Sequence, residues 1–422
     1  MLMAFRFVHT ADLHLDSPLK SLALRDAEIA EIVGNATRQA LERTVDICLE
    51  EQIDALLIAG DLFDGDQRSV KTAIFLGTQM RRLTVTGIRV FVIRGNHDAE
   101  SSITRHLSLP DGVYVFTGHA GAVQIEDREI AIHGVSFARS EMPESLLPKY
   151  RQPLPDCTNI GLLHTSLAGA QGHDVYAPCS LADLTAHGFD YWALGHIHKR
   201  QVHAETPCTV LMPGMPQGRD IGEAGPKSVT LVTIADDGLV SLDERITSVA
   251  QFERISLDVT SKDEWRDVLR ALEKALGEGR GHAVSDHLIV RIDIVGRTPL
   301  ASRLRRDADV LLGEARQAAA SVGRTSVEKL SIDVRPPSVT GPTTGHDPLT
   351  ELRTLMSTDV LASNAHLTAA RAVIEELQRQ LPPELRGTFG DSDAALDRTV
   401  AQLIRQGGED VLARLDAGEG PT

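Results

Sequence analysis

The stretch that decides the fold is Leu56-Leu57-Ile58-Ala59-Gly60-Asp61-Leu62-Phe63-Asp64. Its first four residues form a short apolar run, which is typical of a strand buried on both faces of a parallel sheet. The run ends abruptly at Gly60-Asp61, so a carboxylate follows the C-terminal end of the strand. Ligands bind at that edge in open α/β sheets. We therefore expect a functional site at the end of this strand.

Four further strand ends carry polar side chains in the same way. Strand 5–8 precedes Asp12-Leu13-His14, strand 90–93 precedes Gly95-Asn96-His97-Asp98, strand 160–163 precedes His164, and strand 191–194 precedes Gly195-His196-Ile197-His198. Any one of these motifs, taken alone, is more often a capping Asp or a structural histidine. All five in this order, each after a strand, favour one shared site.

The residue types at these strand ends indicate a metal site. Asp, His and Asn bind borderline to hard divalent ions, and no thiol is among them, which favours manganese, iron or zinc over copper or an iron-sulfur cluster. The set is too large for one ion. Two ions about 3.5 to 4 Å apart, sharing a carboxylate, would use all of it, and that is the usual arrangement for phosphoester hydrolysis. Asp61 is the natural bridging ligand.

These motifs, taken in order, resemble those of the calcineurin-type metallophosphoesterases. Three longer stretches resemble, more narrowly, the SbcD-type DNA repair exonucleases and especially their YhaO-like branch. They are residues 9–18 (HTADLHLDSP), 193–200 (ALGHIHKR) and 213–219 (PGMPQGR). The resemblance is strong over roughly the first 250 residues and weak beyond them.

The resemblance implies two ligand sets that share Asp61. One ion takes Asp12, His14, Asp61 and His198, and the other takes Asp61, Asn96, His164 and His196. Mn²⁺ is the expected metal, with Fe²⁺, Zn²⁺ and Mg²⁺ as alternatives. A hydroxide between the ions is the expected nucleophile, because divalent cations lower the pKa of bound water from near 16 to around neutrality.

His97 and Asp64 are the expected catalytic pair. Because His97 follows a predicted metal ligand by one position, it should lie beside the ions and serve as the general acid that protonates the leaving oxygen. The resemblance implies that Asp64 orients this histidine. An Asp64 that simply caps the next helix is the alternative.

Other polar residues have weaker assignments. Lys199, Arg200 and Arg219 lie just beyond ligand-bearing loops, where contact with a DNA backbone and plain solvated charge are about equally expected. His9 precedes the first motif and should lie behind the metal ligands. The remaining candidates lack a motif partner and are expected to be surface or structural histidines: His119, His133, His173, His187 and His203.

The order of elements predicts an α/β (α+β) protein. Apolar residues at helical spacing over 27–51 and 70–83 make two crossover helices, and the resulting βαβαβ start implies parallel strands. From residue 113 onwards we expect more antiparallel pairing, with a closing hairpin at 228–234 and 239–246. By resemblance, residues 1–250 form a dinuclear catalytic domain, a four-layer β-sandwich flanked by helices.

Two smaller regions follow. The pattern of residues 251–336 is typical of a β-α-β-α-β unit. This unit is either a packing domain or, as the resemblance implies, a cap that guides substrate. A Pro, Gly and Thr linker opens residues 337–422, and two apolar helical stripes follow it. The resemblance implies that these helices bind an SbcC-like coiled-coil ATPase. Docking on the chain's own domains is the alternative, and a homodimer is also left open.

Composition limits the function classes. No apolar run approaches the 18 or more residues of a membrane span, the N-terminus passes directly into the first strand, and the four cysteines are isolated, so we expect a cytoplasmic protein without membrane contact. The formal net charge of −16 counts against a generally basic nucleic-acid-binding surface. The sequence has no P-loop, so an ATP-driven step would need another chain.

The leading interpretation is a metal-dependent phosphodiesterase that acts on DNA, as an exonuclease or endonuclease subunit of a DNA repair complex. The alternative is a small-molecule phosphodiesterase acting on a cyclic nucleotide or a nucleotide-lipid, which the acidic charge favours. A noncatalytic scaffold for a repair ATPase is disfavoured, because a decayed site loses its ligands first. Fold and metal site alone do not separate these functions.

Overall fold

The computed structural model describes residues 4–17, 27–64, 69–99, 109–167, 176–337, 348–361, 363–381, 389–390 and 392–416. All residues predicted to form the site lie in these ranges. The chain divides into two compact units. The first contains Met1–Arg254, Gly279–Val290 and Arg324–Glu328, and the second contains Ile255–Glu278, Arg291–Gly323 and Lys329–Thr422.

The first unit contains two six-stranded sheets. One has the order β12-β11-β1-β2-β3-β4, built from β1 (Phe5–Thr10), β2 (Ala55–Ala59), β3 (Arg89–Ile93), β4 (Val113–Val115), β11 (Ser228–Ile234) and β12 (Val240–Ile246). Strands β1 to β4 are parallel, and the predicted β11–β12 hairpin pairs antiparallel at one edge.

The other sheet has the order β5-β6-β7-β8-β10-β9. Its strands are β5 (Gly121–Ile125), β6 (Ile130–Gly134), β7 (Thr158–His164), β8 (Tyr191–Gly195), β9 (Gln201–Ala204) and β10 (Thr209–Met212). The expected antiparallel pairing is confined to its two edges, because β6, β7, β8 and β10 are all parallel.

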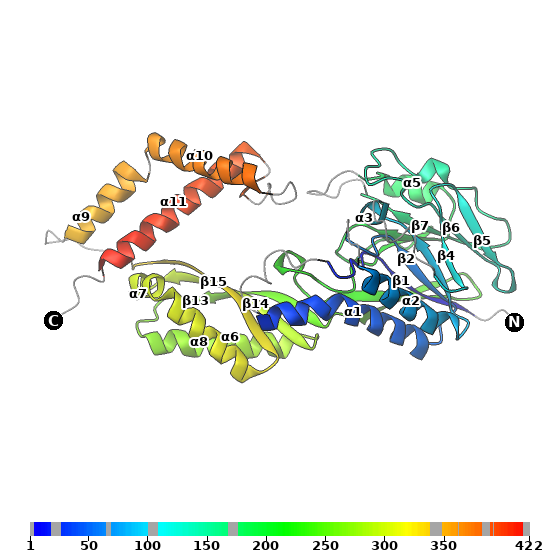
Figure 1. The fold of residues 1–422 in the computed structure, drawn as a ribbon, viewed down its shortest axis with the longest axis horizontal. Coiled ribbons are helices and arrows are strands. Elements are labelled where there is room, and N and C mark those ends of the chain that lie inside the picture. The colour runs from blue at the N-terminus through cyan, green and yellow to red at the C-terminus, as the bar shows by residue number, and fades with distance from the viewer. Residues whose placement is uncertain are drawn as a thin grey trace. The chain divides into compact units, whose positions relative to one another are not determined.

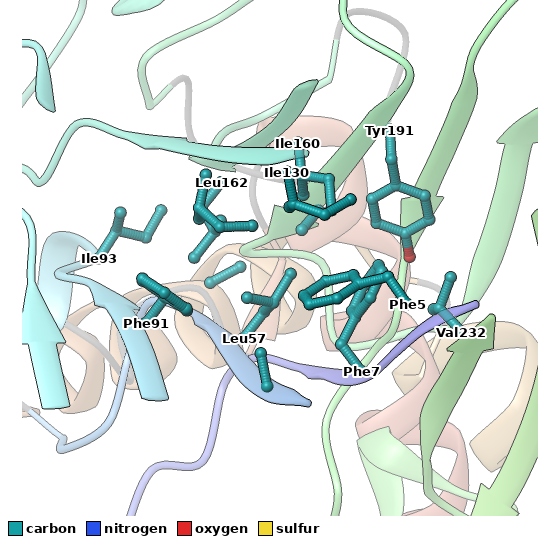
Figure 2. Close-up of a cluster of buried hydrophobic side chains, with 14 of the residues drawn as sticks. Phe5, Phe7, Leu57, Phe91, Ile93, Ile130, Ile160, Leu162, Tyr191 and Val232 are labelled. Atoms are coloured by element: carbon teal, nitrogen blue, oxygen red, sulfur yellow. The ribbon is translucent and has the colours of Figure 1, made fainter. Parts of the chain in front are cut away.

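The main core lies between the two sheets (Figure 2). Phe7 and Leu57 of the first sheet meet Ile160, Leu162 and Tyr191 of the second, and all five side chains are buried. Successive side chains of a strand point to opposite faces. A strand between two packed layers is therefore apolar throughout, which explains the continuous run of β2.

Helices cover the outer faces of both sheets. The alternate residues Leu56 and Ile58 of β2 pack with side chains of α1 (Ala27–Glu50) and α2 (Val70–Thr84). Trp192 of β8 packs with Leu184 of α5 (Leu181–Ala186) on the other side. Helix, sheet, sheet and helix make four layers (Figure 1), so the predicted fold is confirmed. Short helical turns complete the unit: α3 (Asn96–Ala99), η1 (Glu126–Arg128), η2 (Leu147–Lys149) and η3 (Ile221–Glu223).

A three-stranded sheet carries the β-α-β-α-β pattern predicted for the middle of the chain. Its order is β13-β14-β15, from β13 (Ala250–Asp258), β14 (His287–Arg297) and β15 (Thr325–Arg335). Helix α6 (Trp265–His282) makes the first connection, and α7 (Ala301–Arg306) with α8 (Ala308–Val322) makes the second. The boundary between the two units falls within each of the three strands, so the predicted division at 250 and 336 stays a prediction.

The C-terminal stripes form helices, as predicted. They are α9 (Pro348–Leu355), a π-helical turn at Met356–Val360, α10 (Asn364–Gln380) and α11 (Asp393–Asp416). Helix α11 contacts α7, and its Leu412 is buried, so it docks on the chain itself. Helix α10 contacts α11 but buries no residue. Linker residues 338–347 lie outside the described ranges, and no described helix has the length and apolar character needed to cross a membrane.

Candidate metal centre

The strand ends of both sheets meet at one edge of the first unit and bring the predicted ligands together. Asp12 and His14 follow β1, Asp61 follows β2, Asn96 follows β3, His164 ends β7, and His196 and His198 follow β8. Two of the contacts that join the sheets are between predicted ligands. His14 Nε2 lies 3.2 Å from His198 Nε2, and Asp61 Oδ2 lies 3.4 Å from His164 Nε2.

Two groups made only of these side chains have the geometry to hold a metal ion, and His14 forms a third such group with Asp64 and His97. Ligand atoms of Asp12, His14 and His198 lie within 4.8 Å of one another, and so do those of Asp12, Asp61 and His164. Asp12, His14 and His198 all belong to the first predicted ligand set. The other group contains Asp61 and His164 of the second predicted set, together with Asp12, which was not predicted for that set.

Asn96 and His196 lie beside the second group without belonging to it. Asn96 Oδ1 is 2.9 Å from His164 Nε2. The His196 ring packs edge-on against the His164 ring, with 5.2 Å between centroids. The structure therefore gathers all seven predicted ligands, with His196 in ring contact.

Left-handed backbone at four of the predicted ligands shows that this edge is tightly constrained. The φ angles are 54° at Asp12, 41° at His14, 54° at Asp61 and 104° at His196. Such angles cost of order 1 to 3 kcal/mol at residues other than glycine and persist where the surroundings enforce them. Here the backbone N–H of Asp12 donates to Gly60 O at 3.0 Å, and the N–H of His196 donates to the Asp12 carboxylate at 3.1 Å.

Two glycines allow the ligand-bearing loops to approach closely. A Cβ at Gly60 would lie 2.5 Å from His164 Nδ1, and the φ of Gly60 is +97°. A Cβ at Gly95 would collide with Asp61 Oδ1 and lie 2.8 Å from His164 Cε1. The glycines that precede Asp61 and Asn96 are therefore required by the site itself.

Electrostatics distinguish the two buried carboxylates. Burial raises the pKa of Asp12 to about 6. Burial also acts to raise the pKa of Asp61, but the neighbouring His164 outweighs it and holds that pKa below its usual range. Conversely, burial acts to lower the pKa of His164, and the Asp61 carboxylate raises it to about 9.

The donor set fits divalent cations. Burial keeps the pKa of His14 well below its ordinary value, so its ring is neutral and offers lone pairs. The buried His14 Nδ1 makes no hydrogen bond to any described residue. Two ring nitrogens facing each other at 3.2 Å, with buried carboxylates around them, form an arrangement that a cation stabilises.

His97 and Asp64 form a pair at the mouth of the site. His97 Nδ1 is 3.0 Å from Asp64 Oδ1, and the His97 side chain is 40% exposed. Burial acts to lower the pKa of His97, but the hydrogen bond to Asp64 and the negative charges of Asp61 and Asp64 together raise it above its usual value. The alternative role for Asp64 was to cap the next helix. That helix is α2, and its N-cap is Ser69, whose hydroxyl accepts the backbone N–H of Thr72.

Asp98 is a structural residue that the sequence did not single out. Its buried carboxylate accepts backbone N–H groups from Leu62 at 3.1 Å, Phe63 at 3.0 Å and Gly95 at 3.1 Å. It therefore ties the loop after β2 to the loop after β3. The sequence signal was its place at the end of the Gly-Asn-His-Asp motif.

Glu223 is the second residue that sequence reasoning missed. Its Oε1 lies 2.7 Å from His198 Nδ1, and the Arg219 guanidinium also binds it, with Nη2 2.8 Å away. Glu223 belongs to none of the metal-binding motifs, so only the folded loop reveals it. Arg219, a candidate for contact with a DNA backbone, pairs with Glu223, and its Nη1 lies 3.8 Å from Asp64 Oδ2.

The other candidates are placed as follows. Lys199 is exposed, and Arg200 Nε donates to Thr230 Oγ1 at 3.2 Å. His9 is buried behind the site, where its ring bridges Tyr191 Oη and Leu194 O at 3.0 Å each, so it links β1 to β8. His133 Nε2 lies within hydrogen-bond distance of Asn159 Oδ1, and His187 Nε2 of Arg151 O. His119 is exposed and His203 is half-buried. His173 lies outside the described residues.

Comparison with known proteins agrees with this geometry. Residues 5–200 match the family of calcineurin-like phosphoesterases, and residues 252–335 match the family described as metallophosphoesterase YhaO, middle domain. The chain is 34% identical over 303 residues to an uncharacterized metallophosphoesterase YhaO of Bacillus subtilis, which covers 71% of this chain and 74% of that protein.

More distant relatives are named as nucleases or DNA repair proteins. Identity is 26% over 212 residues to the DNA double-strand break repair protein Mre11 of Sulfurisphaera tokodaii, covering 47% of this chain and 50% of that protein. Identity is also 26% over 265 residues to a subunit of the nuclease SbcCD of Bacillus subtilis, covering 54% and 66%. On the first relative's identity and coverage, this chain belongs to the YhaO family of calcineurin-like metallophosphoesterases, hydrolases of phosphoester bonds whose fold binds divalent metals.

Proposed function

We propose that this phosphoesterase cleaves phosphodiester bonds in DNA, as a nuclease subunit of a DNA repair complex. The observation that carries the phosphodiesterase chemistry is the pairing of His97 with Asp64 beside the two ligand groups. The choice of DNA is supported by the relatives named as nuclease and break-repair proteins.

The metal centre would hold two divalent ions, with Mn²⁺ as the proposed metal. The predicted sets are Asp12, His14, Asp61 and His198 for one ion, and Asp61, Asn96, His164 and His196 for the other. Divalent cations in such a site supply a reactive water near neutral pH and offset the negative charge of the phosphate.

His97 would act on the leaving group. Its Nδ1 is engaged by Asp64, which leaves Nε2 for the substrate. The carboxylate favours the protonated ring, so His97 can donate a proton to the oxygen that departs from phosphorus. Asp64 is the residue that orients it.

The substrate surface and the partner are further parts of this proposal. Lys199 and Arg200 follow the His196-Ile197-His198 loop and would meet the backbone of bound DNA. The partner would be a coiled-coil ATPase bound through α10, because Leu377 on that helix remains 45% exposed. The competing substrate, a cyclic nucleotide or nucleotide-lipid, is favoured by the net charge of −16.

One assay separates these substrates. The full chain, loaded with Mn²⁺, is offered linear DNA, a cyclic dinucleotide and an aryl phosphodiester in parallel, with chelator-treated protein and Asp61→Asn as controls. We expect chelator-sensitive cleavage of DNA above the rate on the cyclic dinucleotide. Cleavage of the cyclic dinucleotide in preference to DNA would move the proposal to the small-molecule alternative.

A further inference from the structure

The loop between β10 and β11 supports His198 from behind. At its end, in the turn η3, the carboxylate Oε1 of Glu223 lies 2.7 Å from His198 Nδ1. The Glu223 side chain is largely buried, with 13% of its surface exposed. A short contact to a buried carboxylate is a strong hydrogen bond.

This contact determines which His198 nitrogen carries the hydrogen. An ionised carboxylate only accepts hydrogen bonds, so His198 Nδ1 must donate. In the neutral ring the lone pair then lies on Nε2, the atom that faces His14 Nε2 at 3.2 Å. The ring nitrogen directed toward the proposed metal is therefore the one able to bind it.

Arg219 fixes the orientation of Glu223. Its backbone N–H donates to Glu223 Oε2 at 2.7 Å, and its guanidinium donates to Oε1 at 2.8 Å and to Oε2 at 3.3 Å. Both carboxylate oxygens are thus held by the same arginine while one also binds His198. Two hydrogen bonds from a guanidinium, which is always charged, favour the ionised form of this carboxylate.

The beginning of the same loop is anchored by its own contacts. The Gln217 carboxamide accepts from Val249 N at 2.8 Å and donates to Ala250 O at 2.7 Å. Met215 N donates to His198 O at 3.2 Å. A Cβ at Gly214 would lie 2.8 Å from that same carbonyl oxygen, so the loop packs directly on the His198 backbone.

We propose that Glu223, held by Arg219, is a positioning residue that sets the tautomer and ring orientation of His198 and thereby the affinity for the ion assigned to Asp12, His14, Asp61 and His198. This inference rests on the metal centre proposed above. Loss of a hydrogen-bond partner behind a metal-binding histidine typically weakens metal affinity about 10- to 100-fold.

The test is calorimetric titration of the chelator-stripped full chain with Mn²⁺. Glu223→Ala should weaken binding of one ion about 10- to 100-fold and change the other far less. Glu223→Gln should recover part of the loss, because its carbonyl oxygen still accepts from Nδ1. The matched control is Asp46→Asn, which removes a carboxylate bound to Arg82 at 2.6 Å on the outer helices and should bind both ions like the wild type.

A second readout reports the tautomer without any metal. In histidine-labelled, metal-free protein, the Nδ1–H of His198 should give a protected proton signal that Glu223→Ala abolishes. If Glu223→Ala does not fold, Arg219→Lys carries the test, since lysine keeps the charge but loses the planar fork. That variant should weaken the same ion by a smaller factor.

The outcomes separate the two proposals. A wild-type chain that binds no Mn²⁺ overturns the metal centre and the proposed function. A wild-type chain that binds two ions, with Glu223→Ala binding both equally well, overturns only the role of Glu223. Equal weakening of both ions in Glu223→Ala would also overturn it, because a general loosening of the fold would then be the cause.

Discussion

His97 and Asp64 are hydrogen-bonded through Nδ1 and Oδ1 at 3.0 Å, although they follow different strands of the first sheet. Ser17 Oγ donates to the other carboxylate oxygen of Asp64 at 2.6 Å. The imidazole is therefore held at one nitrogen while 40% of its side chain stays exposed. This is the arrangement that a proton donor at the mouth of a hydrolase site requires.

Replacing His97 should reduce turnover and leave the metals in place. We expect His97→Ala to retain its bound Mn²⁺ and to lose roughly 100- to 10,000-fold in turnover, the usual contribution of a positioned acid. The loss should shrink on aryl phosphodiesters with good leaving groups, which depart without a proton. A uniform loss across leaving groups would instead assign His97 to substrate positioning.

Replacing Asp61 should remove both ions. Asp61→Asn substitutes an amide with one neutral acceptor oxygen for a carboxylate that can bridge two cations. We expect mass spectrometry to find both metals depleted and the activity lost, with the fold retained. Two tightly bound ions and substantial turnover in this variant would show that Asp61 is not the bridge.

A methyl group at Gly95 should disrupt the site from within. In Gly95→Ala the new Cβ would collide with Asp61 Oδ1, so we expect weaker metal binding and low activity in a folded protein. Gly77→Ala is the control, because a Cβ at Gly77 in α2 meets nothing within 4 Å. That variant should gain about 0.5 to 1 kcal/mol of stability. Wild-type metal affinity in Gly95→Ala would contradict the close approach.

Acid should destabilise the first unit through His9. Burial lowers the pKa of His9 to about 3, whereas the unfolded chain takes up this proton near pH 6.5. Between those values the unfolded state binds one more proton, so stability falls as the pH falls, by about 1.4 kcal/mol per pH unit. Denaturant unfolding of metal-free protein at pH 7 and pH 5 measures this loss.

The His9 contribution can be isolated by substitution. His9→Gln should be less stable than the wild type at pH 7 but lose less on going to pH 5. His119→Gln, which changes an exposed histidine, should keep the wild-type pH dependence. An unchanged pH dependence in His9→Gln would show that His9 is not buried in its neutral form.

The two C-terminal helices should respond differently to a charge. Leu412 in α11 is 3% exposed, so Leu412→Asp should unfold this region, whereas Leu377 in α10 is 45% exposed and Leu377→Asp should not change the melting temperature. If α10 binds the partner ATPase, Leu377→Asp should lose copurification while keeping basal activity. Retained copurification would place the partner surface elsewhere on the chain.

The sequence by itself determined where the buried strands end and which polar residue types lie at those ends. A continuous apolar run such as that of β2 reports burial on both faces, and Asp61, Asn96 and His164 lie at or within three residues of the ends of their strands. Because these positions are local to each strand, the order of residues was enough to predict the fold and to name the side chains that it gathers at one edge; their roles as metal ligands stay a prediction. The helical stripes were readable for the same reason.

Only the tertiary structure decided which distant side chains meet. The predicted ligands come from two sheets, and the packing of Phe7 and Leu57 against Leu162 and Tyr191 brings the sheet edges together. The contact of His198 with Glu223 depends on a loop anchored by Gln217, so no local pattern encodes it. Side-chain hydrogen bonds across a fold depend on how layers pack, which is why the support behind the ligands had to be seen in three dimensions.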